Sequence, residues 1–278
     1  MRCLGSILAV LILLSVDAAT HKPFLEADFL LASEIESKVI RACVRPGDTV
    51  FDAGANIGDW MREVILHCKP SLSRLHAFEP VPETFQALST AFSGQDNLKL
   101  NQLALWEEIT MKDFFVFEDG SRFSGFHNRS NFAIDHFRRR HIQVRTTTLS
   151  HYCRQAHVTE IRFLKLDVEG AELAVLWGAE GLLVQHKIDF IQFEYGGTYL
   201  DSGSTLEETF GLLSGNGYVM FKLVGSDQLL LIRRWYSSLE DWTWNTFLAV
   251  KPELVPNIPA ASARHAPPYG SMADAAAA

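Results

Sequence analysis

The sequence is poor in cysteine. Its 278 residues contain four, Cys3, Cys43, Cys68 and Cys153, and none of their spacings matches a zinc-binding pattern or a disulfide framework. Disulfide-rich scaffolds are therefore excluded, and we expect buried free thiols and no metal site. If the first residues are a cleaved leader, an odd number of cysteines remains, which gives no support for an oxidising compartment.

Basic charge and long apolar runs are also scarce. The chain has 25 Lys and Arg against 33 Asp and Glu, a net charge of -8. This balance is atypical of proteins that bind nucleic acids or anionic membranes, so we expect no nucleic-acid partner. The uncharged stretch 3–16 is shorter than the roughly 20 residues that cross a bilayer, and no stable membrane span is predicted.

The two ends differ in composition from the rest. Arg2 precedes the uncharged stretch, and Val16-Asp17-Ala18 resembles the small residues before a signal-peptidase site. We predict a signal peptide at 1–19, which would direct the protein to the secretory pathway; a start-site error would leave it cytoplasmic. The Ala- and Pro-rich segment 256–278 is predicted to be a disordered tail. Residues 20–255 then form one domain.

Within that domain, short apolar runs alternate with helical patterns. The runs cover 49–51, 75–78, 98–105, 161–166 and 188–193, and two more, at 218–223 and 245–250, can pair as closing strands. Such alternation predicts an α/β fold with a mostly parallel sheet. Residues 111–126 interrupt it, and because Asp119-Gly120 is a typical turn, we predict an inserted β-hairpin there.

The most informative stretch is the turn Asp52-Ala-Gly54-Ala-Asn56-Ile-Gly58, between a predicted strand and a predicted helix. A dinucleotide fingerprint has glycines at positions i, i+2 and i+5, but Asn56 and Asp59 stand two and five residues after Gly54. The Gly-Lys-Ser/Thr of a phosphate loop is also absent. An aspartate at the strand end would repel a pyrophosphate but suits a cationic, hydroxyl-rich ligand. S-adenosylmethionine, with its sulfonium, ammonium and ribose, fits this description. An ordinary tight turn is the alternative.

Two later features support a nucleoside ligand. Glu79 ends the second predicted strand, 25 residues after Gly54, where an acid in this architecture binds ribose hydroxyls. A carboxylate can accept two hydrogen bonds from a vicinal diol. Leu103 and Ala104, at the end of the third predicted strand, could form an apolar wall for an adenine, although core packing explains them equally well.

Acidic residues gather after the fourth and fifth core strands. Asp167-Val-Glu169-Gly-Ala-Glu172 follows the strand at 161–166, and Glu194 ends the strand at 188–193. Acids at a helix start are explained by capping and the helix dipole. Three acids in six residues exceed that need, and the carboxyl ends of parallel strands are where ligands bind. We therefore predict that these acids face a ligand.

Together these residues resemble the FkbM-type S-adenosylmethionine-dependent methyltransferases. The resemblance runs from about Thr49 to Leu223 and is carried by VFDAGANIGD, HAFEPVPETF, FLKLDVEGAELAVLWGA and IDFIQFEY. It implies a Rossmann-like methyltransferase fold, with a mostly parallel seven-stranded sheet and an antiparallel closing strand. One departure is Ser150, where the family commonly has an aspartate.

The resemblance also implies O-methylation of a hydroxyl on a sugar or secondary metabolite, that is, a small-molecule or carbohydrate acceptor. Cofactor binding would fall to Asp52, Gly54, Asn56, Gly58 and Glu79, with Leu103 and Ala104 at the adenine. Asp167, Glu169 and Glu194 would face the methyl group and the acceptor, Asp167 as base. Two rivals stay open: a secreted binding module without catalysis, and, less favoured, an NAD-dependent oxidoreductase.

Overall fold

The computed structural model describes residues 26–68, 74–117, 123–129, 138–225, 228–257 and 263–265. The predicted signal peptide at 1–19 lies outside these residues, as does most of the predicted tail. No helix in the described segments has both the length and the apolar character needed to cross a bilayer.

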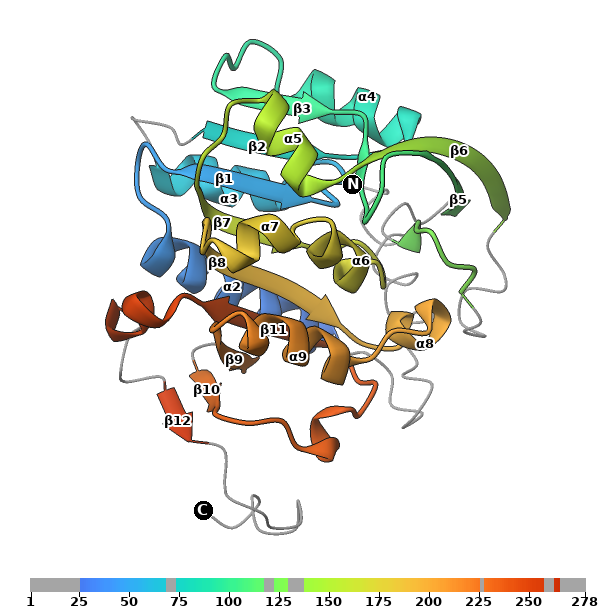
Figure 1. Ribbon diagram of the computed structural model, residues 1–278. Coiled ribbons are helices and arrows are strands. Elements are labelled where there is room, and N and C mark those ends of the chain that lie inside the picture. The colour runs from blue at the N-terminus through green and yellow to red at the C-terminus, as the bar shows by residue number, and fades with distance from the viewer. Residues whose placement is uncertain are drawn as a thin grey trace.

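A nine-stranded sheet organises the domain (Figure 1). Five of its strands are parallel neighbours, which confirms the predicted α/β, Rossmann-like class. In spatial order they are β3 (Leu98–Asn101), β2 (Arg74–Phe78), β1 (Thr49–Ala53), β7 (Ile161–Leu166) and β8 (Ile188–Tyr195). The antiparallel strand β11 (Asn245–Val250) then pairs with β8, and β9 (Val219–Val224) pairs with β11. These seven strands match the expected sheet.

Two strands extend the sheet beyond this expectation. The strand β10 (Gln228–Ile232) pairs with β9, and β12 (Ala263–His265) pairs in parallel with β10. Residues 263–265 thus form a short strand within the segment 256–278 that was predicted to be disordered. A short 3-10 helix, η4 (Pro252–Asn257), follows β11. The third predicted strand is also shorter than expected, because β3 ends at Asn101 and residues 104–105 join a different sheet.

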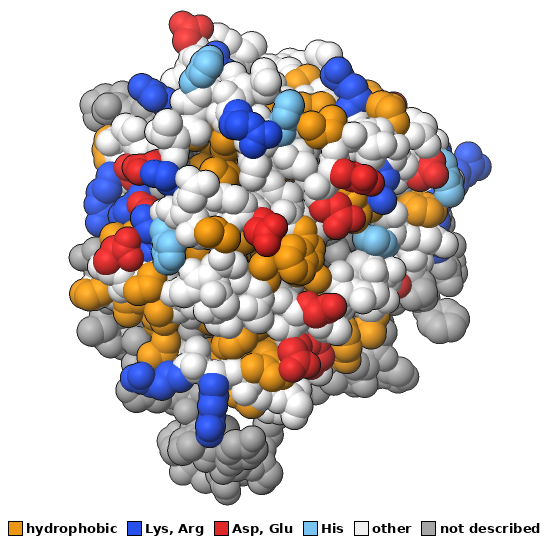
Figure 2. All heavy atoms as spheres, in the orientation of Figure 1, with side chains coloured by type: hydrophobic (Ala, Val, Ile, Leu, Met, Phe, Trp, Pro, Cys, Tyr) orange, Lys and Arg blue, Asp and Glu red, His pale blue; other side chains and the backbone are white. Residues whose placement is uncertain are grey.

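Helices cover both faces of the sheet because side chains alternate between its faces along each strand. Val50, Phe163 and Phe190 pack in the core beneath α2 (Glu26–Cys43), α3 (Asp59–Cys68) and α4 (Pro82–Ala91). The opposite face, turned toward the viewer in Figure 1, carries Phe51 and Leu164. It is covered by α5 (Leu149–Gln155), α6 (Glu172–Trp177), α7 (Glu180–Val184) and α9 (Leu206–Gly215). In Figure 2 acidic, basic and apolar side chains are interspersed on this face, so it carries no single sign of charge.

The insertion differs from the predicted hairpin. The strand β5 (Met111–Phe117) pairs antiparallel with β6 (Arg139–Thr147), and β6 pairs in parallel with β4 (Ala104–Leu105), which gives a three-stranded sheet. In place of the second strand of the predicted hairpin, the described residues show one isolated antiparallel bridge, between Phe115 and Gly125. The predicted turn at Asp119-Gly120 lies outside the described residues. The long-range partner β6 offers β5 seven paired residues, which outweighs the short local hairpin.

Candidate active site

Three carboxylates stand at the carboxyl ends of adjacent strands, as the sequence predicted. Asp52 lies on β1, Asp167 directly follows β7, and Glu194 lies near the end of β8. By strand alternation all three share the sheet face of α2 and α3. Lys165 joins them, because the strand register places it beside Asp52. Lys165 was not among the predicted site residues, although a charged residue inside the apolar run Phe163–Leu166 is a recognisable signal.

Asp52 has an unusual environment. Its side chain is completely buried, and neither carboxylate oxygen has a hydrogen-bond partner among the described residues. The Lys165 Nζ atom lies 3.9 Å from Oδ1. Burial raises the pKa of Asp52 to about 6, although Lys165 acts to lower it. A buried carboxylate without donors is costly to keep ionised, and such groups are typical of ligand sites.

Lys165 is the cation at the centre of the cluster. Its side chain is 7% exposed, and Nζ donates a hydrogen bond of 2.9 Å to Asp167 Oδ2. Burial disfavours its charge, but the surrounding acids outweigh burial and hold its pKa above the usual range; these acids are Asp167, Asp52, Glu36 and Glu194. Acidic side chains therefore outnumber this lysine at the sheet edge.

Glu36 connects the N-terminal helix α2 to this cluster, a connection that the sequence did not reveal. Its Oε1 atom accepts a hydrogen bond of 2.6 Å from Gln192 Nε2 on β8. Gln192 is paired in register with Lys165. Burial raises the pKa of Glu36 to about 7. One helix and three strands thus contribute to a single buried polar row.

The glycines of the turn after β1 are required by packing. Gly54 has φ +82°, and a Cβ atom there would lie 1.8 Å from the carbonyl oxygen of Asp167. Gly58 has φ +87°, and its Cβ would lie 2.3 Å from the ring of Phe92. Asn56 is also left-handed, with φ 47°. The sequence interpretation assigned the glycines to close approach by a ligand; the structure shows that they admit the backbone of Asp167 and the helix α4.

Glu79 joins two loops at the sheet edge. Its two oxygens accept hydrogen bonds from the backbone N–H groups of Asn56, at 3.1 Å, and Val81, at 2.9 Å. The side chain is 6% exposed, and burial raises its pKa to about 7. Each carboxylate oxygen can accept a second hydrogen bond. Glu79 therefore shapes the loops while keeping acceptor capacity for hydroxyl groups.

A cleft open to solvent lies beside these loops. Of the predicted site residues, Gly54, Glu79, Ala104 and Asp167 line it, whereas Leu103 packs against the core instead. The insertion supplies a wall that the sequence did not predict, formed by Phe114, Ser124 and Phe126. The remaining lining residues are Phe78, Pro80, Val81, Leu105 and Val168. The cleft combines apolar walls with the carboxylates of Glu79 and Asp167.

The acids after Asp167 have partners of their own. Glu169, with a left-handed φ of 55°, forms an ion pair with Arg129 of the insertion. Burial lowers the pKa of Arg129 to about 10. Glu172 is buried, accepts a hydrogen bond from the Val168 N–H at 3.0 Å, and has its pKa raised by burial to about 8. Glu169 thus links the insertion to the loop after β7, and Arg129 was missed because it lies 40 residues upstream.

Glu194 is paired with an aromatic side chain. Its Oε2 atom accepts a hydrogen bond of 2.8 Å from Trp244 Nε1, and the Trp244 ring is 37% exposed. Burial, together with Asp167, raises the pKa of Glu194 well above its usual range. The site therefore presents a carboxyl group beside an indole ring. Among the described residues, no three His, Cys, Asp or Glu side chains are grouped so that they could hold a metal ion.

Comparison with known proteins agrees with this architecture. The methyltransferase FkbM domain matches residues 52–220, from Asp52 on β1 to Met220 on β9. The chain belongs to the FkbM methyltransferase family. A curated relative, the 31-O-demethyl-FK506 methyltransferase FkbM of Streptomyces tacrolimicus, is 29% identical over 161 residues, which are 49% of this chain and 61% of the relative. The chain thus matches less than two thirds of that relative's length.

Two solved structures have related shapes. Methyltransferase FkbM from Methylobacillus flagellatus KT is 17% identical, with a TM-score of 0.46 over 74% of this chain and 44% of that one. Fibrillarin from Aeropyrum pernix, solved with natively bound S-adenosyl-L-methionine, is 13% identical, with a TM-score of 0.41 over 78% of this chain and 76% of that one. These similarities are distant.

Proposed function

We propose that this FkbM-family protein is an S-adenosylmethionine-dependent O-methyltransferase whose acceptor is a hydroxyl of a sugar, glycan or secondary metabolite. The observation that carries the proposal is the state of the Asp52 carboxylate. It is buried near the carboxyl end of β1 and has no hydrogen-bond donor among the described residues. A cationic ligand group would satisfy it, and S-adenosylmethionine carries both an ammonium and a sulfonium.

The other residues of the edge fit the same cofactor. Glu79 retains acceptor capacity for two ribose hydroxyls. Ala104 and Phe126 give the cleft apolar walls suited to a flat base. Asp52 and Glu79 would therefore hold the cofactor's polar groups, and the insertion would cover its apolar part.

The protein's part in the reaction is alignment and proton transfer. When bound, the cofactor would supply an activated methyl group, and the acceptor oxygen would bond to the methyl carbon as the thioether sulfur leaves in line. Alignment of this kind can contribute about 7–11 kcal/mol, more than general-base assistance. Asp167, which lines the cleft, would accept the hydroxyl proton as the acceptor oxygen forms its bond to carbon. Lys165 holds Asp167 in place at 2.9 Å.

Residues around Asp167 would bind the acceptor. Glu194 and the half-exposed Trp244 offer a carboxyl group beside an aromatic face, a pairing that suits a polyhydroxylated ring with apolar faces. Glu169 would contribute through its ion pair with Arg129. We keep the secretory leader at 1–19 as part of the proposal, because an extracellular or luminal enzyme would have access to glycans.

A ligand panel tests the proposal. Thermal denaturation is measured with S-adenosylmethionine, its demethylated product and NAD, followed by transfer of a labelled methyl group to a panel of sugars and polyols. We expect stabilisation by the first two ligands, none by NAD, and label in a base-stable ether. Asp52→Asn should abolish the stabilisation, whereas the control Asp59→Asn, on the exposed start of α3, should retain it.

The outcomes separate the three readings. Stabilisation by NAD alone would favour an oxidoreductase. A folded protein that none of the ligands stabilises would favour a binding module. Label found on nitrogen or sulfur of an acceptor would refute O-methylation while keeping methyl transfer. An Asp167→Asn variant that binds cofactor and retains full turnover would remove Asp167 from the role of base.

A further inference from the structure

Lys165 has surroundings that its hydrogen bond to Asp167 alone does not account for. A lysine in the middle of an apolar strand is expensive to bury, yet its side chain is only 7% exposed. Strand register sets it between Asp52 on β1 and Gln192 on β8. On the same side, Nζ lies 5.9 Å from the centre of the Trp60 ring. Its neighbours therefore come from three separate elements, β1, α3 and β8.

The two contacts of its ammonium differ in kind. Nζ donates a hydrogen bond to Asp167 Oδ2 at 2.9 Å, which fixes the direction of that carboxylate. The 3.9 Å separation from Asp52 Oδ1 is too long for a hydrogen bond. It remains close enough for a strong charge interaction in a buried site. One cation thus orients the first acid and stabilises the charge of the second.

We propose that Lys165 is a positioning residue, whose ammonium orients Asp167 through a hydrogen bond and keeps the buried Asp52 in its carboxylate form. That these two carboxylates then serve the methyl acceptor and the cofactor rests on the proposed function. The charge on Lys165 itself does not depend on that function, since it follows from the acids around it.

The balance of charge explains why one lysine is needed. The titratable groups that face Asp52 and Lys165 come from α2, the loop after β2, the end of β7 and β8; they are Glu36, Glu79, Asp167 and Glu194. Arg129, from the insertion, faces Asp167 and Glu194. Without Lys165, burial and the neighbouring acids would act on Asp52 unopposed, and a proton would neutralise it. A protonated Asp52 cannot attract a cationic ligand.

The test follows Asp52 directly in the protein without ligand. Isotope-labelled aspartate NMR is recorded as a function of pH, and the Asp52 signal is assigned with Asp52→Asn. Lys165→Met removes the charge at similar length, and we expect the Asp52 titration midpoint to rise by at least about one pH unit. Lys165→Arg restores the charge and should bring the midpoint back toward the wild-type value.

Lys251→Met is the matched control. Lys251 also donates a 2.9 Å hydrogen bond to an aspartate, Asp189, but at the opposite edge of the sheet. This variant loses an ion pair of the same length and should leave the Asp52 midpoint unchanged. A folded Lys165→Met protein with a wild-type Asp52 midpoint would overturn the inference.

Two further measurements test the role of Lys165 independently of the Lys165→Met titration. If Lys165→Met does not fold, isotope-labelled lysine NMR of the wild-type protein decides, because a Lys165 amine that is neutral near pH 7 contradicts the proposal. The pH dependence of S-adenosylmethionine affinity should also move: in Lys165→Met its loss on the acid side begins at a higher pH, by the same amount as the Asp52 midpoint. A wild-type protein that does not bind this cofactor at any pH refutes the proposed function, whereas the Asp52 titration still judges Lys165.

Discussion

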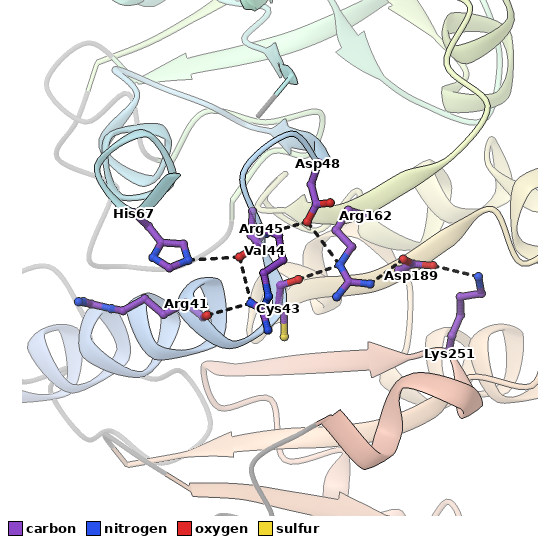
Figure 3. A network of polar contacts seen from close by, with 9 residues as sticks. All are labelled: Arg41, Cys43, Val44, Arg45, Asp48, His67, Arg162, Asp189 and Lys251. Atoms are coloured by element: carbon purple, nitrogen blue, oxygen red, sulfur yellow. Dashed lines mark hydrogen bonds and ion pairs between the residues drawn. The ribbon is translucent and has the colours of Figure 1, made fainter. Parts of the chain in front are cut away.

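The strands β1, β7 and β8 have charged residues at or next to both ends. These residues differ in their hydrogen-bond partners between the edge formed by the amino ends of the strands and the edge formed by their carboxyl ends. At the amino edge, Arg162 donates hydrogen bonds to Asp189, at 2.9 Å, and to the Cys43 carbonyl, at 2.8 Å (Figure 3). Lys251 donates to the other oxygen of Asp189 at 2.9 Å. Asp48 accepts from the Arg45 N–H at 2.7 Å. Each of these acids has a donor.

The carboxyl edge differs at one position. Asp167 and Glu194 accept hydrogen bonds there, at 2.9 Å from Lys165 and 2.8 Å from Trp244, whereas Asp52 has no hydrogen-bond donor among the described residues. Burial raises the pKa of Asp52 to about 6. The amino edge therefore stabilises the fold through paired charges, whereas the carboxyl edge keeps one buried acid, Asp52, that the fold does not satisfy. Substitutions at the two edges should accordingly change different properties.

The largest expected effect concerns two left-handed glycines, one at each edge. Gly54→Ala places a Cβ atom 1.8 Å from the Asp167 carbonyl oxygen, so β1 and β7 must separate. We expect a loss of about 3 kcal/mol or more in the free energy of unfolding, measured by chemical denaturation. Gly47→Ala is the control, because its φ is +91° and no atom lies within 4 Å of its Cβ; it should lose only about 1 kcal/mol. Equal losses would contradict the packing explanation.

A smaller effect is expected from the paired amino edge. Arg162→Met removes the hydrogen bonds to Asp189 and to the Cys43 carbonyl, and both charged side chains of the pair are less than a third exposed. The loss should be about 2 kcal/mol, with cofactor affinity unchanged. The control Lys187→Met breaks an exposed pair with Glu160 and should change stability by less than about 0.5 kcal/mol. A change in cofactor affinity in Arg162→Met would show that the two edges are coupled.

This contrast shows what the sequence could and could not predict. A residue's place along a strand determines which edge it reaches, so Asp52, Asp167 and Glu194 were placed correctly at the carboxyl edge from their positions alone. What surrounds them depends on distant segments. Glu36 joins the cluster through its contact with Gln192, 156 residues away in the sequence, and no local sequence pattern predicts such a contact.

The insertion illustrates the same limit. The turn residues Asp119-Gly120 favour a local hairpin, but β5 pairs mainly with β6, and this pairing depends on the fold of both segments. Gly54 is a second case: the sequence identifies a turn glycine, whereas the backbone of Asp167 that it contacts is visible only in three dimensions. The periodicity of apolar residues and the position of a residue along its strand can be read from the local sequence. The residues that it packs against come from distant segments and cannot.

The smallest expected effect is a change in the free energy of unfolding that has opposite signs for aspartates at the two ends of β1. Because the folded-state pKa of Asp52, about 6, lies above the model-compound value of 3.8, folding favours its protonated form. This contribution to stability is fully present below the lower value and is lost as the pH rises through the higher one. Asp52→Asn, which cannot ionise, should therefore be more stable than wild type by about 1 kcal/mol near pH 8. Near pH 4 the two proteins should be equal.

The control for this prediction is Asp48→Asn, directly before the first residue of β1. Asp48 accepts a backbone hydrogen bond and lies 3.5 Å from Arg162, so its loss should cost about 1 kcal/mol near pH 8. Chemical denaturation of both variants at the two pH values measures the difference. If Asp52→Asn instead destabilises the protein near pH 8, the ionised Asp52 is already satisfied within the fold, and the argument that it awaits a cationic ligand fails.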